Sequence, residues 1–481
     1  MLPQSQSQSA EKFFTLSEFR REVGLPLVLV KKLIIWGEVK AEKALDGTLR
    51  VAEPEIGKIK NLIKNPRKKL VFFFRALGPG LITGAADDDP GGIGTYSSAG
   101  AKFGLGIIWM AAWLLPVMLA AQEVCARLGI ITNKGLAGVL QQYFRKPIIF
   151  GLVGLLLFAN IVNIGADLGA MAASLKMLSG FNFYLAAIIF AAFIILVEVF
   201  VEYHLYVKFL KWLAFSLLAY VATGLMIGID WPMVLREMIV PQIKLNQEYL
   251  FAMIAVFGTS VTPYLFFWQT SEEVEENKLV KKKFRLPRLH QRVRRMRTDV
   301  SAGIILANLV FFFIILTTAQ VFFKNGITEI NSAEQAALAL RPLVGDYAYF
   351  LFAFGIIGAG LLAVPVLAGS GAYALAELMK WREGLEMKFS QAKGFYWIII
   401  ISVFLGLLMN FFKINPIKAL YYSAFINGLI ALPLLTAIMI VGDKKKIVGA
   451  ETHPFWVRIF GWAGVLFMFV SLAAVCYFYL C

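Results

Sequence analysis

The sequence predicts an all-α polytopic membrane protein of about 11 transmembrane helices, preceded by a small soluble module. Hydrophobic residues make up 59% of the 481 and charged residues only 16%, whereas soluble domains carry about 25% charged residues. Apolar runs of about 20 residues recur from Leu70 to the C-terminus, and each is long enough to cross a bilayer core of roughly 30 Å. Proline and glycine interrupt two of these runs, which is typical of transporters.

The division into domains follows from where the apolar runs begin. We expect a cytoplasmic module over residues 1–69 and a transmembrane domain over residues 70–481. No apolar segment with a cleavage site occurs in the first 70 residues, so we expect no cleaved signal peptide. The expected spans are 76–103, 106–128, 148–176, 183–202, 205–228, 250–270, 299–323, 345–370, 394–412, 416–441 and 457–479.

The net charge of +16 is explained by topology. The loop 272–297 alone holds ten Lys and Arg residues, and the other basic loops, 380–393 and 442–448, also follow even-numbered spans. Cytoplasmic loops of membrane proteins are rich in Lys and Arg. We therefore expect a multi-pass protein of the cell membrane with a cytoplasmic N-terminus and an external C-terminus. The bilayer is the expected partner of this charge and nucleic acid is not.

The N-terminal module has a pattern of helix, turn, helix and β-hairpin. Ser17 precedes the amphipathic stretch "SEFRREVG", which Gly24 ends. "LPLVLVKKLIIWG" follows, and then a segment in which Asp46-Gly47 is a strong hairpin-turn signal. Over about 50 residues the module resembles winged helix-turn-helix domains of the MerR/excisionase type.

DNA binding is not the function that we expect of this module. At the positions where such domains place polar residues that contact bases, this chain has Val28 and Leu29, although Lys31 and Lys32 remain. Apolar side chains read base edges poorly, because direct readout needs hydrogen-bond donors and acceptors. Docking or regulation at the cytoplasmic face is the favoured interpretation.

The first span contains "GAADDDPGGIG" at residues 84–94, with three consecutive aspartates. An ionised Asp at the bilayer centre costs roughly 2.5–3.5 kcal/mol, so these acids must face protein or a water-filled path. Asp89-Pro90-Gly91-Gly92 then breaks the helix. A carboxylate beside freed carbonyls at a helix break is how transporters hold cations near the midplane.

The sixth span has a matching break in "FGTSVTPYLFFWQT" at residues 257–270. Pro263 follows a run of small and hydroxyl residues that includes Thr259 and Thr262. Breaks in the first and sixth spans indicate an inverted five-plus-five repeat with the site between the two breaks.

The spans resemble the NRAMP divalent-metal transporters, which have a LeuT-type fold of five plus five inverted spans and, here, one more. The matching motifs are "GPGLITGAADDDPGGIGTYSSAGAKFG" (78–104), "ARLGIIT" (126–132) and "GLAGVL" (135–140), and the resemblance covers about residues 70–480. It implies a transporter with divalent metal ions as substrate, no enzymatic activity and no cofactor.

The resemblance also implies a set of metal ligands. The family motif Asp-Pro-Gly-Asn corresponds to Asp89-Pro90-Gly91-Gly92, and Ala-x-x-Met-Pro-His corresponds to residues 259–264. By this correspondence the metal would contact the Asp89 carboxylate, the carbonyls of Ala86 and Thr259, and the side-chain positions of Gly92 and Thr262.

The departures from the family pattern point to a harder and more hydrated ion. Methionine sulfur suits transition metals, whereas Thr262 offers a hard oxygen. Gly92 offers no side chain and leaves room, and Mg²⁺ usually keeps several of its waters. Asp87 and Asp88 would add negative charge near the site.

The residues that carry protons in the family are also largely absent. Tyr264 and Gln269 occupy the positions of two sixth-span histidines, and neither titrates near neutral pH. Asp167 matches an acidic position in the third span, but Ala170 replaces the family's glutamate three residues later. The arginine pair of the family's ninth span has no counterpart in "GFYWIIIISVFLG". In the tenth span, Asn427 is a further polar candidate along the path.

These departures resemble the NRAMP-related magnesium transporters. The resemblance implies a uniporter that imports hydrated Mg²⁺, and Mn²⁺, by alternating access without proton coupling. One alternative is a proton-coupled Mn²⁺/Fe²⁺ importer, which strong competition by Fe²⁺ or Cd²⁺ would favour. Another is a membrane-embedded sensor that acts through its N-terminal winged helix. An amino-acid symporter is disfavoured, because three acids stand where a substrate carboxylate would bind. No oligomeric state follows from the sequence.

Overall fold

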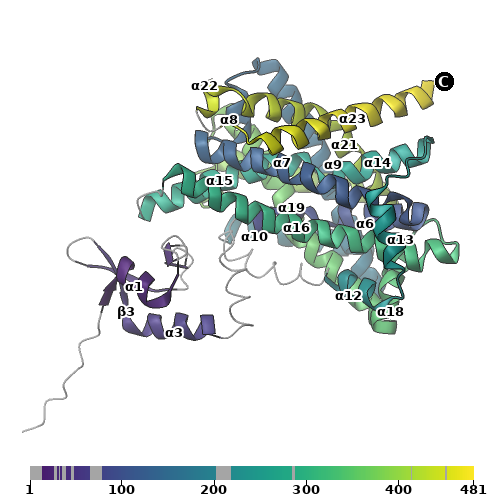
Figure 1. Cartoon of the computed structure of the whole chain (residues 1–481), viewed down its shortest axis with the longest axis horizontal. Helices are drawn as coiled ribbons and strands as arrows, with labels where there is room; N and C mark the ends of the chain where they lie inside the picture. The colour runs from purple at the N-terminus through teal and green to yellow at the C-terminus, as the bar shows by residue number, and fades with distance from the viewer. Residues whose placement is uncertain are drawn as a thin grey trace, which may run out of the picture. The chain divides into compact units, whose positions relative to one another are not determined.

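The computed structural model divides into two compact units, residues 1–78 with 276–291 and residues 79–275 with 292–481 (Figure 1). Each unit is described here by itself. The structure describes all residues except 1–12, 26–29, 32, 35–38, 45–47, 65–78, 202–217, 284–287, 413, 450–451 and 481. The expected domain boundary at residues 69/70 therefore lies outside the described residues.

The N-terminal unit has a three-stranded antiparallel sheet in the order β1-β3-β2. The first helix begins earlier than Ser17 suggested, because Thr15 is its N-cap in a capping box with Glu18. The helix ends at Gly24, as expected, in a left-handed backbone conformation. The elements are β1 (Phe13–Thr15), α1 (Leu16–Val23), β2 (Ala41–Lys43), β3 (Leu49–Ala52) and α3 (Glu53–Lys64).

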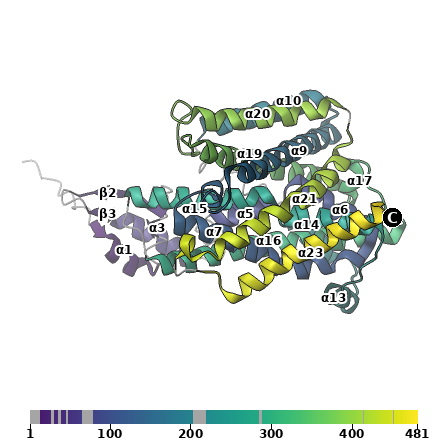
Figure 2. The ribbon, with the colours of Figure 1, turned by 90° about the horizontal axis from the view of Figure 1, so that it is seen from above.

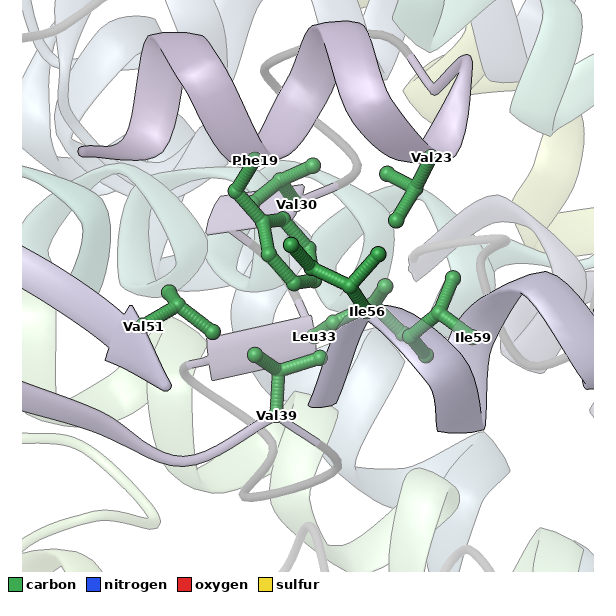
Figure 3. Packing of buried hydrophobic residues seen from close by; sticks show 8 residues of the cluster. All are labelled: Phe19, Val23, Val30, Leu33, Val39, Val51, Ile56 and Ile59. Carbon is green, nitrogen blue, oxygen red and sulfur yellow. The ribbon is translucent and has the colours of Figure 1, made fainter. Parts of the chain in front are cut away.

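The core of this unit is a cluster of aliphatic side chains around one aromatic ring (Figure 3). The cluster joins α1, α3 and β3 with residues between them, and consists of Phe19, Val23, Val30, Leu33, Val39, Val51, Ile56 and Ile59. Val28, Leu29, Lys32 and Asp46-Gly47 lie outside the described residues, and the Lys31 side chain is half-buried. The winged-helix interpretation thus remains a prediction.

The second unit is helical throughout its described part. The helices of the expected spans are α5 (Pro79–Asp87), α6 (Pro90–Phe103), α7 (Trp109–Thr132), α9 (Lys146–Ser179), α10 (Phe183–Phe200), α12 (Leu218–Met226), α14 (Gln247–Ser260), α15 (Pro263–Lys283), α16 (Leu289–Val321), α19 (Ala348–Met379), α20 (Lys393–Met409), α21 (Pro416–Gly442) and α23 (Phe455–Leu480). Short helices connect them: η1 (Gly104–Ile107), α8 (Leu136–Leu140), α13 (Trp231–Ile239), η3 (Phe323–Asn325), α17 (Ala333–Ala337), η4 (Leu338–Leu340), α18 (Arg341–Val344), η5 (Gly345–Tyr347), η6 (Asn410–Phe412) and α22 (Lys445–Val448).

In the described part of the chain, nine helices are long and apolar enough to cross a membrane. Two of the eleven expected spans are missing from this set for separate reasons. The first span is broken into α5 and α6, each too short to qualify alone. Most of the fifth span falls within residues 202–217, and only α12 of it is described. The exact count of eleven therefore stays a prediction.

The packing of the spans agrees with a repeat of five. The third and fourth spans (α9, α10) pack against the eighth and ninth (α19, α20), and these four helices lie together on one side of the unit in Figure 2. The tenth span, α21, packs against α14, α9 and α6, and α23 packs against α7. The helices that carry the breaks are thus enclosed by neighbours.

Glycines allow the broken helices to approach their neighbours closely. A Cβ at Gly258 of α14 would collide with the backbone of Ala424 and Gly428 in α21. A Cβ at Gly80 of α5 would lie 2.6 Å from the backbone nitrogen of Val300 in α16. Backbone cannot move aside as a side chain can, so both contacts require glycine.

We expect Gly258→Ala to destabilise the protein by about 1–3 kcal/mol, because overpacking forces the α14 and α21 backbones apart. Thermal unfolding in detergent measures this as a lower midpoint temperature. Gly151→Ala is the matched control, since a Cβ at Gly151 meets nothing within 4 Å. Equal midpoints for the two variants would show that this close contact is not required.

Candidate metal-binding site

The break in the first span places a carboxylate at the start of a helix. α5 ends at Asp87 and α6 begins at Pro90, with Asp89 as its N-cap. The Asp89 Oδ1 atom accepts a hydrogen bond from the Gly92 N–H at 2.6 Å. The three aspartates are all at most 5% exposed. The helix N-terminus thus stabilises one buried negative charge at the break.

The break in the sixth span lies beside the first. α14 ends at Ser260 and α15 begins at Pro263, so Val261 and Thr262 link the two helices. The Thr262 hydroxyl donates a hydrogen bond of 3.3 Å to Asp87 Oδ1. Both side chains are buried. The structure therefore brings the two predicted breaks together through their polar side chains.

Each proline frees one carbonyl of the preceding helix. In an α-helix the N–H of a residue bonds to the carbonyl four residues earlier, and proline has no N–H. Pro90 stands four residues after Ala86, and Pro263 stands four residues after Thr259. The carbonyls of Ala86 and Thr259, which the family resemblance assigns to the metal, are therefore among those left without a helical donor.

Tyr264, which was expected near the path as the counterpart of a family histidine, lies at this site. Its hydroxyl lies 2.9 Å from the Ala86 carbonyl oxygen and 3.2 Å from Asp89 Oδ2, and it donates to both. The side chain is fully buried. Its hydrogen-bond partners could not be predicted from the sequence, because they are more than 170 residues away along the chain.

Position 92 faces the same space. A Cβ added at Gly92 would lie 3.2 Å from the Asp87 carbonyl oxygen and 3.5 Å from Asp89 Oδ1. A longer side chain here would extend among these oxygens. Glycine is therefore the residue that fits here, because the Asp87 carbonyl oxygen already lies close to the Cβ position.

Two other predicted residues, Asp167 and Gln269, differ in whether they interact with Asp89. Asp167 of α9 is buried and interacts electrostatically with Asp89. Gln269 contacts other groups: it accepts from the Thr83 hydroxyl at 2.5 Å and donates to Glu273 at 3.0 Å. Gln269 thus ties α5 to α15 rather than reaching Asp89.

Asn427 is buried in α21, and within the described part of the chain its Oδ1 has no hydrogen-bond partner. The next residue, Gly428, packs against the Ile254 backbone of α14. This close packing explains the glycine, while a role for Asn427 along the path remains a prediction.

The donors at the breaks are hard oxygens of several kinds. Among the residues that the structure describes, no group of three or more His, Cys, Asp or Glu side chains could hold a metal ion. A cation between the breaks would therefore depend on one or two carboxylates together with backbone carbonyls, a hydroxyl and water. Such a donor set suits Mg²⁺, Ca²⁺ or Mn²⁺.

Comparison with known proteins decides the family. The model of the family described as "Natural resistance-associated macrophage protein-like" (Nramp) matches residues 80–477. The chain belongs to the Nramp family. Members of this family are metal-ion transporters and not enzymes, so the predictions of a transport function and of no cofactor are confirmed at this level.

Named relatives agree with this assignment. The "Divalent metal cation transporter MntH" of Klebsiella pneumoniae subsp. pneumoniae is 24% identical over 404 residues, which cover 82% of this chain and 92% of the relative. The protein of the same name from Yersinia enterocolitica is 27% identical over 407 residues, covering 82% and 93%. These names state the function of the relatives, to which this chain is similar.

Solved structures show the same fold. A variant of the Eremococcus coleocola manganese transporter has a TM-score of 0.65 at 16% identity, covering 82% of this chain and 84% of that one. Mhp1, a nucleobase-cation-symport-1 family transporter in a closed conformation, has a TM-score of 0.52 at 15% identity, covering 83% and 93%. The predicted class, an all-α multi-pass transporter of the LeuT type, is confirmed.

A buried ion-pair network lies elsewhere in this Nramp chain, between α7 and α16. Glu123 accepts hydrogen bonds from Arg127 at 2.6 Å and from Arg297 at 2.7 and 3.0 Å. The side chains of Glu123 and Arg127 are 2% and 3% exposed. Two residues beyond Arg297, Asp299 accepts from the Gly80 N–H at 2.9 Å. The start of α16 is thus fixed to both α7 and α5.

We expect Glu123→Gln to cost about 3 kcal/mol or more, because it removes the counter-charge of the buried Arg127 guanidinium. The matched control is Asp443→Asn. This change neutralises an acid in a more exposed pair with Arg458, which is worth at most about 1 kcal/mol. Thermal unfolding of both variants in detergent tests the difference, and an equal loss in the two would contradict it.

Proposed function

We propose that this Nramp chain imports hydrated Mg²⁺, and Mn²⁺ as well, by alternating access and without moving protons. The observation that carries the proposal is the position of Thr262. Its hydroxyl reaches the first-span break, where it donates to Asp87. A hard oxygen therefore stands where the family places a soft sulfur, and hard donors favour Mg²⁺ over softer transition metals.

The donor set at the breaks supports the same ion. Mg²⁺ binds through one or two carboxylates and keeps several waters. Asp89 offers the carboxylate, the carbonyls of Ala86 and Thr259 are released by the prolines, and Gly92 adds no side-chain ligand, so the remaining ligand positions are left to water. Mn²⁺ accepts the same oxygen donors, and relatives of this chain are named for divalent metal ions and for manganese.

The lack of proton coupling follows from the groups around the site. Tyr264 and Gln269 are bound into hydrogen bonds and do not titrate near neutral pH. Asp167 is the one remaining acid expected from the family's proton route. The membrane potential then drives uptake, at roughly 2.3 kcal/mol per charge per 100 mV, or about twice that for a divalent ion. In this proposal the N-terminus is cytoplasmic and the C-terminus is external.

A proton-coupled Mn²⁺/Fe²⁺ importer is the second candidate. The observation that favours it is the buried acid Asp167, which interacts electrostatically with Asp89. The liposome experiment described next separates the two candidates.

In liposomes with an inside-negative potential, we expect the full-length protein to take up Mg²⁺ without acidifying the lumen. Asp89→Ala removes the ligand carboxylate and should abolish this uptake. The measurement uses a Mg²⁺ indicator and a pH dye, both in the lumen. Asp346→Ala is the control, since the Asp346 side chain is 92% exposed and remote in sequence from the breaks. Mn²⁺ entry with acidification, and no Mg²⁺ entry, would favour the second candidate and end this proposal.

We expect Thr262→Met to restore sensitivity to soft ions. A thioether binds Cd²⁺ far better than a hydroxyl does, so the Cd²⁺ concentration that halves Mg²⁺ uptake should fall about tenfold. Thr262→Ser keeps the hydroxyl and should behave as the unaltered protein. An unchanged Cd²⁺ response in Thr262→Met would show that position 262 does not contact the ion.

A further inference from the structure

We propose that the Tyr264 hydroxyl competes with the transported ion: it binds two ion ligands, the Ala86 carbonyl and the Asp89 carboxylate, and must leave them before the ion binds. This inference rests on the proposed function and adds to it a residue that sets the affinity for the ion. It starts from the two hydrogen bonds of Tyr264, at 2.9 Å to Ala86 and 3.2 Å to Asp89.

The chemistry of the two acceptors explains why a hydroxyl is held there. The Ala86 carbonyl has lost its helical donor, because Pro90 follows four residues later. Asp89 Oδ1 is bonded to the Gly92 N–H, and Tyr264 reaches the other oxygen, Oδ2. Both acceptors are buried, where a polar group without a donor is unfavourable, and more so if it is charged. One phenolic O–H relieves this cost for both.

A cation would use the same electron pairs. The lone pairs that accept the tyrosine proton are those that a metal ion, or one of its waters, must contact. The hydroxyl has a single proton and donates it to these oxygens, so it cannot remain in this geometry while a cation lies between them. The neutral Tyr264 hydroxyl thus occupies, reversibly, the place that the positively charged ion would take at these oxygens.

The position of Tyr264 in the chain gives this competition a structural consequence. Tyr264 follows Pro263 in the first turn of α15, whereas its acceptors belong to α5 and to the cap of α6. The hydrogen bonds therefore tie the sixth-span break to the first. Entry of an ion breaks this tie, and the tie can form again when the ion leaves. Transport requires binding that is weak enough to permit release.

Tyr96 supplies a matched comparison. It is also a buried tyrosine close to the breaks, and its hydroxyl lies 3.0 Å from Ser260 Oγ. Ser260 donates its own proton to the Val256 carbonyl, so Tyr96 is the donor to Ser260. Neither predicted ligand, Ala86 nor Asp89, accepts from Tyr96. Loss of this hydroxyl removes a buried hydrogen bond of the same kind without releasing an ion ligand.

The test is Mg²⁺ binding to the full-length protein in detergent, measured by titration calorimetry. We expect Tyr264→Phe to lower the Kd for Mg²⁺ about tenfold, since the ion no longer displaces a hydrogen bond to a buried charged group. Tyr96→Phe should leave the Kd within about twofold. If Tyr264→Phe does not fold, Tyr264→Met fills similar space without a hydroxyl and should show the same gain with Mg²⁺.

The direction in which the Kd changes decides whether the Tyr264 hydroxyl competes with the ion or is one of its ligands. A Kd for Mg²⁺ that rises in Tyr264→Phe would make the phenol oxygen a ligand of the ion and overturn the inference. An unchanged Kd, or an equal gain in Tyr96→Phe, would overturn it as well. If the unaltered protein binds neither Mg²⁺ nor Mn²⁺, the proposed function itself fails, which is a different result from a failure of Tyr264 alone.

Discussion

Two missing backbone donors determine how this protein is built around its centre. Inside a bilayer each backbone carbonyl needs a partner, because lipid supplies none. Pro90 and Pro263 each remove one N–H, so the carbonyls of Ala86 and Thr259 lose their helical bonds at the same two places where the helices break. A structure that keeps such breaks must bury them against one another and supply polar partners. Tyr264 is one such partner, and a transported cation is the other that we propose.

Because acidic side chains are buried beside the two helix breaks, this region favours positive charge. Asp87, Asp88 and Asp89 are at most 5% exposed, and a carboxylate in such surroundings is costly unless a donor or a cation compensates it. At close glycine contacts, α5 packs against the backbone of α16 and α14 against the backbone of α21. The fold therefore maintains a region where positive charge is favoured. The tight packing of the surrounding helices holds this region together.

The sequence predicted the parts of this arrangement that depend on local chemistry. Helix breaks at Asp89-Pro90 and Thr262-Pro263 follow from proline itself, and the apolar runs set the positions of most spans. Pairings between distant residues could not be predicted, because nothing local specifies them: Tyr264 meets Ala86 across 178 positions, and Arg297 meets Glu123 across 174. For the same reason Gln269 was expected near the path as a counterpart of a family histidine, whereas its bonds lead to Thr83 and Glu273.

The two substitutions that flank Pro263 act together. A methionine at position 262 could not donate a hydrogen bond, since a thioether is only a weak acceptor, whereas Thr262 donates to Asp87. On the other side of the proline, Tyr264 donates to Ala86 and Asp89. One turn of chain thus presents two hydroxyls to the acids and the carbonyl of the first break.

Both hydroxyl groups are hard, neutral and unable to give up a proton near neutral pH. A site that exchanges soft and titratable side chains for hydroxyls loses affinity for soft metals and a route for protons by the same change, and it keeps its two halves joined when no ion is bound. In the function that we propose, ion selectivity and the absence of proton coupling are therefore one property of this site, not two.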